Sequence, residues 1–434
     1  MKEEMRRGTG ILLAALAFAG NYSPWVRQAM RLPDTLVLSS GQTHVVQTGL
    51  PMRAQVVSDA VQVAATTDER LGETSVSVSA VQDGEAKVTF SLLGLFPIHE
   101  TRVSVVGERT LIPGGQAIGV AMKTQGVLVV AKSDKIGAAG AAGATGAAGA
   151  TGAGNALRVG DVILSVDDKE VDSAKRLSEC VNTAQGDEIS LRVLRGGKEM
   201  TVQASVPVDS ASGGRRLGVW VRDSTAGVGT LSYIDPEGDA YGALGHAIVD
   251  ADTGGVLSVQ DGAIMRAQVV GVTRGQTGKA GELKGSFLKD NEQIGTLERN
   301  GVYGIYGQLA KRPGDLLYPQ GLPVGSRSAV HTGEASIIAT VDGEGPKEYA
   351  IEIVRCFEQD QPSQKGMILR VTDPELLAKT GGIVQGMSGS PILQDGRIIG
   401  AVTHVYLSDP AQGYGMYIEW MLEQSDGIGE KTAA

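Results

Sequence analysis

Short runs in which apolar and polar residues alternate, separated by glycine turns, fill most of this 434-residue chain. Clear examples are residues 35–39, 54–58, 74–78 and 101–105. A period of two is typical of β-strands, because successive side chains point to opposite faces of a sheet. The chain also holds 61 glycines, which favour tight turns, and few apolar stripes of helix length. We therefore predict a mainly β protein made of many short strands.

The overall composition describes a folded protein with little affinity for polyanions. Apolar residues make up 42% of the chain, which is enough for several cores. Lys and Arg number 39 against 49 Asp and Glu, so the net charge is -10. Because no sustained basic face can come from this balance, we expect no nucleic-acid partner.

Cysteine and histidine usage excludes two further classes of protein. The two cysteines, Cys180 and Cys356, are far apart in the sequence and are predicted to be unpaired thiols rather than a disulfide scaffold. The five histidines are scattered, and no pair has the spacing of metal ligands. We therefore expect neither a metal site nor a cofactor.

Residues 1–33 have the features of an export signal or a membrane anchor. Arg6 and Arg7 precede an apolar run over residues 11–19, which is too short to span a bilayer alone. The sequence Ala-Phe-Ala at 17–19 has the small-x-small form of a cleavage site. Cleavage and anchoring both stay open, and anchoring would bring membrane association through the N-terminus.

Two regions are expected to precede the largest domain. Residues 34–110 form a small β-rich module in which we find no chemistry. Residues 111–207 resemble a PDZ domain, with the turn Gly-Asp-Val-Ile at 160–163 and a Gly-Gly hairpin at 196–197. The resemblance implies that a peptide tail adds as a strand along Ala117, Ile118, Gly119 and Val120. A Gly/Ala/Thr stretch at 137–154 departs from the PDZ pattern and is predicted to be a surface loop.

Residues 217–434 are again rich in strands and glycine turns, which suits a double β-barrel. The strongest motif in them is Gly-Met-Ser-Gly-Ser-Pro at 386–391, the form of the nucleophile loop of chymotrypsin-like serine peptidases. Such a loop aims one hydroxyl at a substrate carbonyl and two N–H groups at the developing oxyanion. We predict Ser388 as the nucleophile and the N–H groups of Gly386 and Ser388 as the oxyanion hole.

A histidine upstream supplies the base that this serine needs. His246 follows small residues and precedes Ser388 in the order usual for the chymotrypsin class. It would take the hydroxyl proton and return it to the leaving amine. The carboxylate that orients the base is open between Asp250, Asp252 and Asp373. His404 is interpreted as a pocket-wall or core residue, since the base is already supplied.

Several stretches together resemble the stage IV sporulation protein B family, PDZ-containing serine peptidases of endospore-forming bacteria. They lie at residues 112–116, 222–230, 241–246, 381–391, 400–405 and 413–422. The resemblance implies a triad of His246, Asp373 and Ser388. It also implies export across the forespore membrane into the intermembrane space and self-processing near the N-terminus. There the family cleaves a regulatory subunit of a membrane-bound sigma-factor processing complex, which triggers activation of the late sigma factor.

Two other functions compete with this interpretation. The chain could be a non-catalytic PDZ scaffold with a peptidase-like barrel, although the intact Gly386, Ser388 and His246 argue against decay. It could also be an envelope protease of the HtrA type. Those enzymes usually carry the PDZ domain after the peptidase, whereas here it comes first, which favours the sporulation function.

Overall fold

A computed structural model describes residues 32–428, with gaps at 49–51, 69–72, 93, 108, 133–144, 148–155, 209–212, 288–292, 360 and 426–427. The predicted signal or anchor, up to residue 31, and nearly all of the predicted loop at 137–154 lie outside the described residues. No helix among those described is long and apolar enough to cross a membrane. The chain divides into two compact units, one of residues 1–110 and 323–331, the other of the remainder.

The first unit consists of two small sheets around one apolar core, antiparallel except that β1 runs parallel to β7. One sheet has the strand order β1-β7-β6-β3 and the other β2-β5-β4. Val76, Val78, Val88 and Phe90 are fully buried between them. The strands are β1 (Thr35–Ser39), β2 (Thr43–Thr48), β3 (Met52–Val56), β4 (Val61–Asp68), β5 (Glu73–Ala80), β6 (Gly84–Leu92) and β7 (Phe96–Val106). Period-two alternation thus produced strands here, with one face of each sheet buried.

The second unit begins with a six-stranded barrel that contains the predicted base. Its ring runs β9-β15-β16-β21 and returns through β19 and β17 to β9. The ring closes where Gly295 of β19 bridges Leu309, just after β21. The strands of this lobe are β8 (Thr110–Pro113), β9 (Ala117–Lys132), β15 (Val219–Ile234), β16 (Ala240–Ala243), β17 (Val259–Thr273), β18 (Glu282–Phe287), β19 (Gln293–Thr296), β20 (Arg299–Gly301), β21 (Gly304–Gln308) and β22 (Leu322–Pro323).

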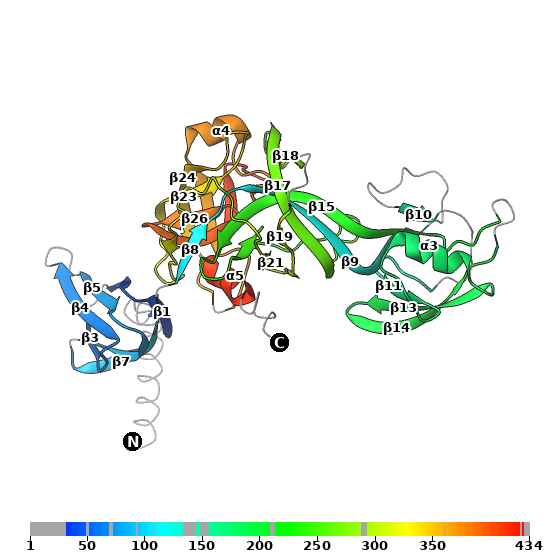
Figure 1. The fold of residues 1–434 in the computed structure, drawn as a ribbon. Coiled ribbons are helices and arrows are strands. Elements are labelled where there is room, and N and C mark those ends of the chain that lie inside the picture. Colours follow the sequence, from blue (N-terminus) through cyan, green and yellow to red (C-terminus); the bar gives the residue numbers. More distant parts are fainter. Residues whose placement is uncertain are drawn as a thin grey trace, which may run out of the picture. The chain divides into compact units, whose positions relative to one another are not determined.

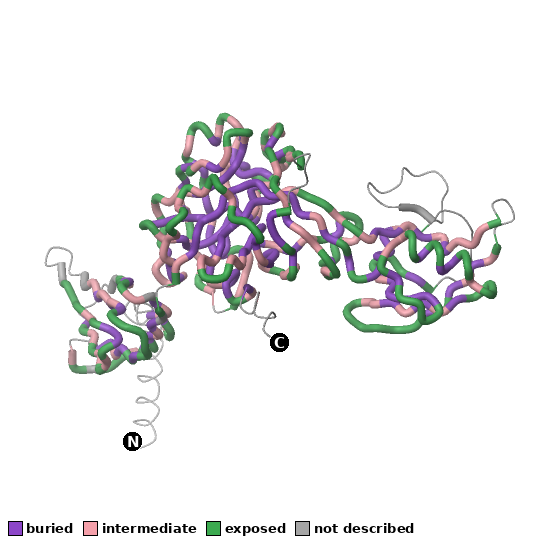
Figure 2. Tube along the Cα trace, viewed as in Figure 1, coloured by how far each residue is buried: buried purple, intermediate pink, exposed green. Residues whose placement is uncertain are grey.

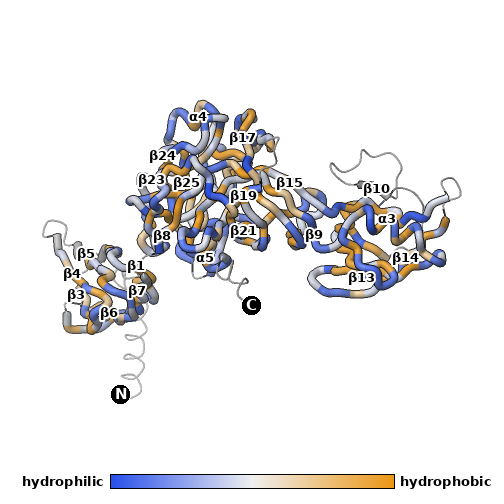
Figure 3. The backbone as a smooth tube through the Cα atoms, in the orientation of Figure 1, coloured by the Kyte–Doolittle hydropathy of each residue, from blue (hydrophilic) through white to orange (hydrophobic). Residues whose placement is uncertain are grey.

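The PDZ-like domain is a sheet of β9, β11, β13 and β14 with one helix packed against it. Ser173 caps that helix by accepting a hydrogen bond from the Arg176 N–H, and Leu177, Cys180 and Val181 form its buried face. Hydrophobic residues recur along β13 and β14 (Figure 3). The elements are β10 (Thr145–Ala147), β11 (Val162–Val166), β12 (Lys169–Glu170), α3 (Ala174–Asn182), β13 (Glu188–Arg195) and β14 (Lys198–Ser205).

This domain is inserted into the first barrel rather than placed before it. Two long antiparallel strands, β9 and β15, run from the barrel into the PDZ-like sheet (Figure 1). Ile118, Val120 and Met122 of β9 belong to the barrel core, whereas Val127 and Val129 belong to the PDZ-like core. The predicted PDZ-like range of 111–207 thus begins on strands that also pack in the core of the barrel. At the far end of β9 the side chains alternate between the two cores, because Leu128 and Val130 pack with the barrel residues while Val127 and Val129 do not.

A second six-stranded barrel completes the unit, in the closed order β23-β24-β25-β28-β27-β26. Its strands have buried centres, and purple segments are frequent in the corresponding part of Figure 2. The helix α4 connects β25 to the loop that carries the predicted nucleophile. The elements are β23 (Gly333–Ala339), β24 (Lys347–Cys356), β25 (Met367–Val371), α4 (Pro374–Thr380), β26 (Pro391–Gln394), β27 (Arg397–Val405), β28 (Gln412–Tyr417) and α5 (Ile418–Ser425).

The prediction of a mainly β protein with a PDZ-like domain and a barrel-containing peptidase domain is confirmed. Cys180 is buried and Cys356 is partly buried, and neither forms a disulfide in the described structure. Within the described ranges, no cluster of His, Cys, Asp or Glu could hold a metal ion.

Candidate active site

The loop that carries Ser388 requires glycine on both sides of the serine. Gly386 and Gly389 have φ angles of 96° and 97°, a region that L side chains rarely adopt. The loop is pinned to β15, because the Thr230 Oγ1 donates to the Gly386 carbonyl at 2.7 Å and the Thr230 N–H donates to the Ser388 carbonyl at 3.2 Å. The tight turn predicted from the sequence is therefore present and is anchored to the first barrel.

Two N–H groups in this loop are free to bind an oxyanion. Met387, Gly389 and Ser390 each donate their N–H to a backbone carbonyl. Among the described residues, neither the Gly386 N–H nor the Ser388 N–H has a protein acceptor. This arrangement fits the predicted oxyanion hole, which needs donors that stay unpaired until the reaction begins.

The predicted base lies at the same cleft as the predicted nucleophile. Two residues in the left-handed region, Leu244 with φ 70° and Gly245 with φ 67°, turn the chain just before His246. His246 and Ser388 both line a cleft of about 390 Å³. Sequence positions about 140 residues apart are thus brought together, as the motif order predicted.

The side chains of Ser388 and His246 each hydrogen-bond to a backbone carbonyl rather than to each other. The Ser388 Oγ donates to the Thr403 carbonyl at 3.0 Å. The His246 Nδ1 lies 2.9 Å from the Ala247 carbonyl oxygen, so a protonated Nδ1 donates there. That bond selects the tautomer whose Nε2 is unprotonated, which is the form a general base needs. Hydrogen bonds of this kind often tighten only when substrate binds.

None of the three candidate acids makes a hydrogen bond or ion pair to His246. Asp373 is the N-cap of α4, where its Oδ1 accepts from the Leu376 N–H at 2.9 Å. Asp250 is buried and pairs with Arg222, which also binds Asp252 at 2.8 Å. Burial raises the pKa of Asp250, but hydrogen bonds from Thr253 and the charge of Arg222 together hold that pKa below its usual value. Asp373 as the triad acid therefore stays a prediction, with its carboxylate engaged elsewhere in this structure.

His404 is a titratable side chain that the structure places close to the base. The centroids of the His246 and His404 rings are 5.9 Å apart, with 44° between their planes. His404 follows Thr403, the residue whose carbonyl accepts the nucleophile's hydroxyl. Sequence reasoning assigned it to a pocket wall or core. His404 directly follows Thr403 on the strand that returns from the serine hairpin. That position was the sequence signal that could have placed His404 near the base.

The prediction that a peptide binds along an open strand edge at residues 117–120 is wrong. Residues Ala117 to Val120 pair with β15 on one side, where Gly229 lies opposite Ile118. Ile118, Gly119 and Val120 also pair with β17 on the other side, where Arg266 lies opposite Ile118. Since both edges already carry a strand, no peptide can be added there. Val120 contributes instead to the lining of the catalytic cleft.

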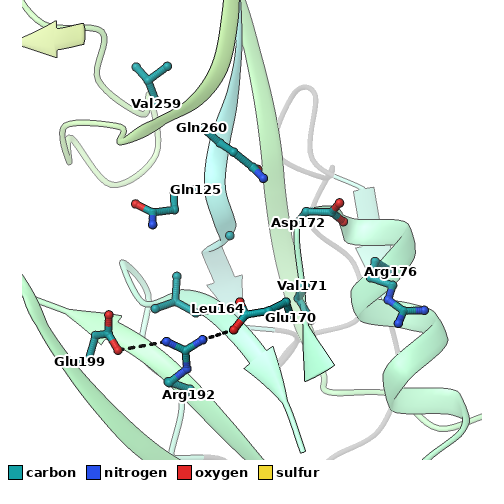
Figure 4. A pocket seen from close by; sticks show the side chains of 11 residues that line it. Gln125, Leu164, Glu170, Val171, Asp172, Arg176, Arg192, Glu199, Val259 and Gln260 are labelled. Atoms are coloured by element: carbon teal, nitrogen blue, oxygen red, sulfur yellow. Dashed lines mark hydrogen bonds and ion pairs between the residues drawn. The ribbon is translucent and has the colours of Figure 1, made fainter. Parts of the chain in front are cut away.

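A larger hollow of about 710 Å³ lies beside α3 and includes Gly126 of β9 and Arg176 of the helix (Figure 4). Arg192 is held there between Glu170 and Glu199, whose Oε2 lies 3.1 Å from the Arg192 Nη1. Since both carboxylates already pair with Arg192, that guanidinium is only partly available to an anionic ligand. The hollow contains none of the predicted catalytic residues.

Comparison with known protein families identifies the domain in which this cleft lies. Residues 213–422 match the family described as SpoIVB peptidase S55, and residues 117–206 match the PDZ domain family. The chain is a SpoIVB-family serine peptidase. The matched range contains His246 and Ser388, so the cleft described above lies in the peptidase domain. The PDZ match begins in the shared strand β9 and covers the inserted domain.

Other comparisons add little to that assignment. No curated protein sequence matches the peptidase. The active form of the Rv3671c protease from M. tuberculosis is similar with 14% identity and a TM-score of 0.30, over 47% of this chain and 75% of that one. An inactive serine-to-alanine mutant of Rv3671c from M. tuberculosis H37Rv gives 14% identity and a TM-score of 0.27, over 48% and 84%.

Gly389→Ala is expected to destroy the nucleophile loop. A Cβ at residue 389 would overlap the Thr230 carbonyl oxygen and lie 2.5 Å from the Leu244 backbone nitrogen. The positive φ adds strain, so we expect a loss of about 3 kcal/mol in the free energy of unfolding and loss of most activity. Thermal unfolding and peptide hydrolysis would measure both. Gly314→Ala is the matched control, since a Cβ there meets nothing within 4 Å. Equal stability of the two variants would contradict this prediction.

Proposed function

We propose that this peptidase is a sporulation signalling endopeptidase. It cleaves a regulatory membrane protein in the space between forespore and mother cell, and it also cuts itself near its N-terminus. The observation that supports this most is one cleft that holds Ser388, His246 and the free N–H groups of Gly386 and Ser388. The sequence around these residues is what resembles the sporulation family, so the site and the family point to the same substrate class.

The cleft suits a stretch of neutral side chains in the substrate. The described residues of its lining include no Asp, Glu, Lys or Arg, and small or aliphatic residues predominate. The lining residues are Val120, Thr225, Ala226, Gly227, Val228, Gly229, Leu244, His246, Ala247, Ile248, Val249, Gln385, Gly386 and Ser388. A charged substrate side chain buried there would lose its hydration without a partner. We therefore infer that neutral residues flank the cleaved bond.

Export places the enzyme with its substrate in this proposal. The basic residues Arg6 and Arg7 and the apolar run at 11–19 support transport across the forespore membrane. The regulatory subunit of a membrane-bound sigma-factor processing complex would then be within reach. Self-processing near the N-terminus would release the enzyme from any anchor that the same segment provides.

Complementation of a sporulating host tests the signalling role. The host lacks its own family member and carries a reporter driven by the late mother-cell sigma factor. We expect the wild-type chain to restore the reporter and to show a shortened N-terminus by mass spectrometry, and Ser388→Ala to do neither. A chain that hydrolyses peptides in vitro but leaves the reporter silent would refute the signalling role while leaving the peptidase activity intact.

A further inference from the structure

The strand that anchors the nucleophile loop has one edge without a neighbouring strand. Residues Ser224 to Thr230 of β15 pair with β9 on one side, with no break in register. On the other side, β15 pairs with β16 from Leu231 onward and with β10 over residues 219–221. Between these two partners, no described residue makes a backbone hydrogen bond to residues 225–229 from that side. An unpaired edge of this kind can accept another strand.

The backbone groups of every second residue along this edge point toward the catalytic cleft. The Thr230 N–H donates to the Ser388 carbonyl, and the Thr230 carbonyl accepts from the Leu244 N–H, each at 3.2 Å. Because hydrogen-bonding directions alternate along a strand, the N–H and C=O groups of Val228 and Ala226 point the same way as those of Thr230. Both residues line the cleft of about 390 Å³ that also holds Ser388.

The cleft has room for a strand beside this edge. Ala226 and Gly227 are exposed. A Cβ added at Gly227 would meet nothing within 4 Å, so the space above that residue is open. Val249, which lines the same cleft, is 49% exposed. An added strand would therefore find free backbone partners and an uncovered apolar side chain in one place.

The part of a substrate that fits this edge is the part that leaves first. His246 returns the serine proton to the leaving amine, and it lines the same cleft as the edge of β15. β27, whose Thr403 carbonyl accepts from the Ser388 Oγ, contributes none of the described lining. The segment after the cleaved bond therefore runs from Ser388 toward Ala226. Since β15 runs the opposite way, the pairing is antiparallel.

We infer that the backbone of Val228 and Ala226 binds the substrate segment after the cleaved bond as an added antiparallel strand. One substrate residue exchanges two hydrogen bonds with Val228, and the residue two positions on exchanges two with Ala226. Ala226 is four residues from Thr230, about 13 Å along the strand, which about four substrate residues span. The substrate is thus an extended segment with free N–H groups, and a helix there must unwind before cleavage. This deepens the proposed function and rests on its peptidase activity, not on its signalling role.

Aminolysis of an acetyl-enzyme measures binding of the leaving side by itself. p-Nitrophenyl acetate acetylates Ser388 of the full-length enzyme, and alanine peptide amides of increasing length then compete with water for the acetyl group. The peptide amine attacks the ester carbonyl, a new C–N bond forms as the bond to the Ser388 Oγ breaks, and the amine proton reaches Oγ through His246. Mass spectrometry gives the ratio of acetylated peptide to acetate, and Ser388→Ala gives the uncatalysed background.

Peptide length and N-methylation test strand pairing on the wild-type enzyme. We expect the ratio to rise with length and to level off at about four residues. In the tetrapeptide amide, N-methylation at either the second or the third residue should lower the ratio about tenfold, and methylation at the other should leave it nearly unchanged. The reason is that only alternate residues bond to an antiparallel neighbour.

Proline variants test the enzyme's side of the pairing. Ala226→Pro removes an N–H that the fold does not use, and it should lower the tetrapeptide ratio about threefold to tenfold. Thr201→Pro on β14, the edge strand of the PDZ-like sheet, is the matched control and should match wild type. Arg195 and Lys198 flank a two-residue turn and bond to each other, so the Thr201 N–H, three residues on, faces away from β13.

Three results would overturn the proposal: a ratio independent of peptide length, equal sensitivity to the two methylations, or equal ratios in the two folded proline variants. If Ala226→Pro does not fold, the methylated peptides decide on the wild-type enzyme alone. Absence of acetylation in wild type would instead refute Ser388 and His246 as the reacting pair, on which the proposal rests.

Discussion

Ser388→Ala is expected to lower peptide hydrolysis by about a millionfold, because removal of a catalytic serine abolishes the covalent pathway. The fold should be unchanged, since the Ser388 side chain makes one hydrogen bond, to the Thr403 carbonyl. Ser390→Ala, two residues on, should keep nearly full activity. Its hydroxyl is fully buried and has no hydrogen-bond partner in the described structure, so its removal is neutral or slightly stabilising.

Hydrolysis of a quenched fluorescent peptide library by the two purified variants separates these serines. Thermal unfolding of both variants should match wild type within a few degrees, which rules out loss of fold as the cause. Retained hydrolysis in Ser388→Ala together with loss in Ser390→Ala would reverse the assignment of the nucleophile.

His246→Ala is expected to have the second of the two largest effects, also about a millionfold in turnover. Catalytic residues that act as one unit are strongly non-additive, so the double variant with Ser388→Ala should be no slower than either single variant. His246 is half-buried in the wall of the cleft, and its ring makes one hydrogen bond. The truncation should therefore leave the barrel folded.

The control for this variant is His99→Ala, a histidine of the first unit that lies 3.5 Å from Asp34. It should retain full turnover on the same peptides. A His246→Ala variant that keeps more than about a hundredth of wild-type turnover would show that another group removes the serine proton. His404 would then be the first residue to examine.

Local sequence was sufficient to predict that Ser388 and His246 meet at one cleft. The Gly386 and Gly389 spacing fixes a turn whose geometry depends mainly on its own residues, and the structure contains that turn. The position of His246 could be predicted because it precedes Ser388 in the order and at the rough spacing that are usual in the chymotrypsin class. Both inferences use short segments in which backbone preferences decide the conformation.

Long-range pairing explains what the sequence could not predict. Residues 117–124 have the pattern of a PDZ strand, but whether its edge is free depends on β17, more than a hundred residues away. Asp373 precedes a proline that begins a helix, and N-capping competes there with a catalytic role. His404 has no motif, and only the packing of β27 against the His246 turn brings the two rings together.

Mass-spectrometric mapping of a fluorophosphonate adduct tests the central claim most directly. The claim is that Ser388, activated by His246, is the nucleophile of this SpoIVB-family peptidase. Full-length wild type, treated at neutral pH and digested, should carry the adduct on Ser388, and His246→Ala and Ser388→Ala should carry none. An adduct on another serine, or peptide hydrolysis by an unlabelled wild-type enzyme, would contradict the account.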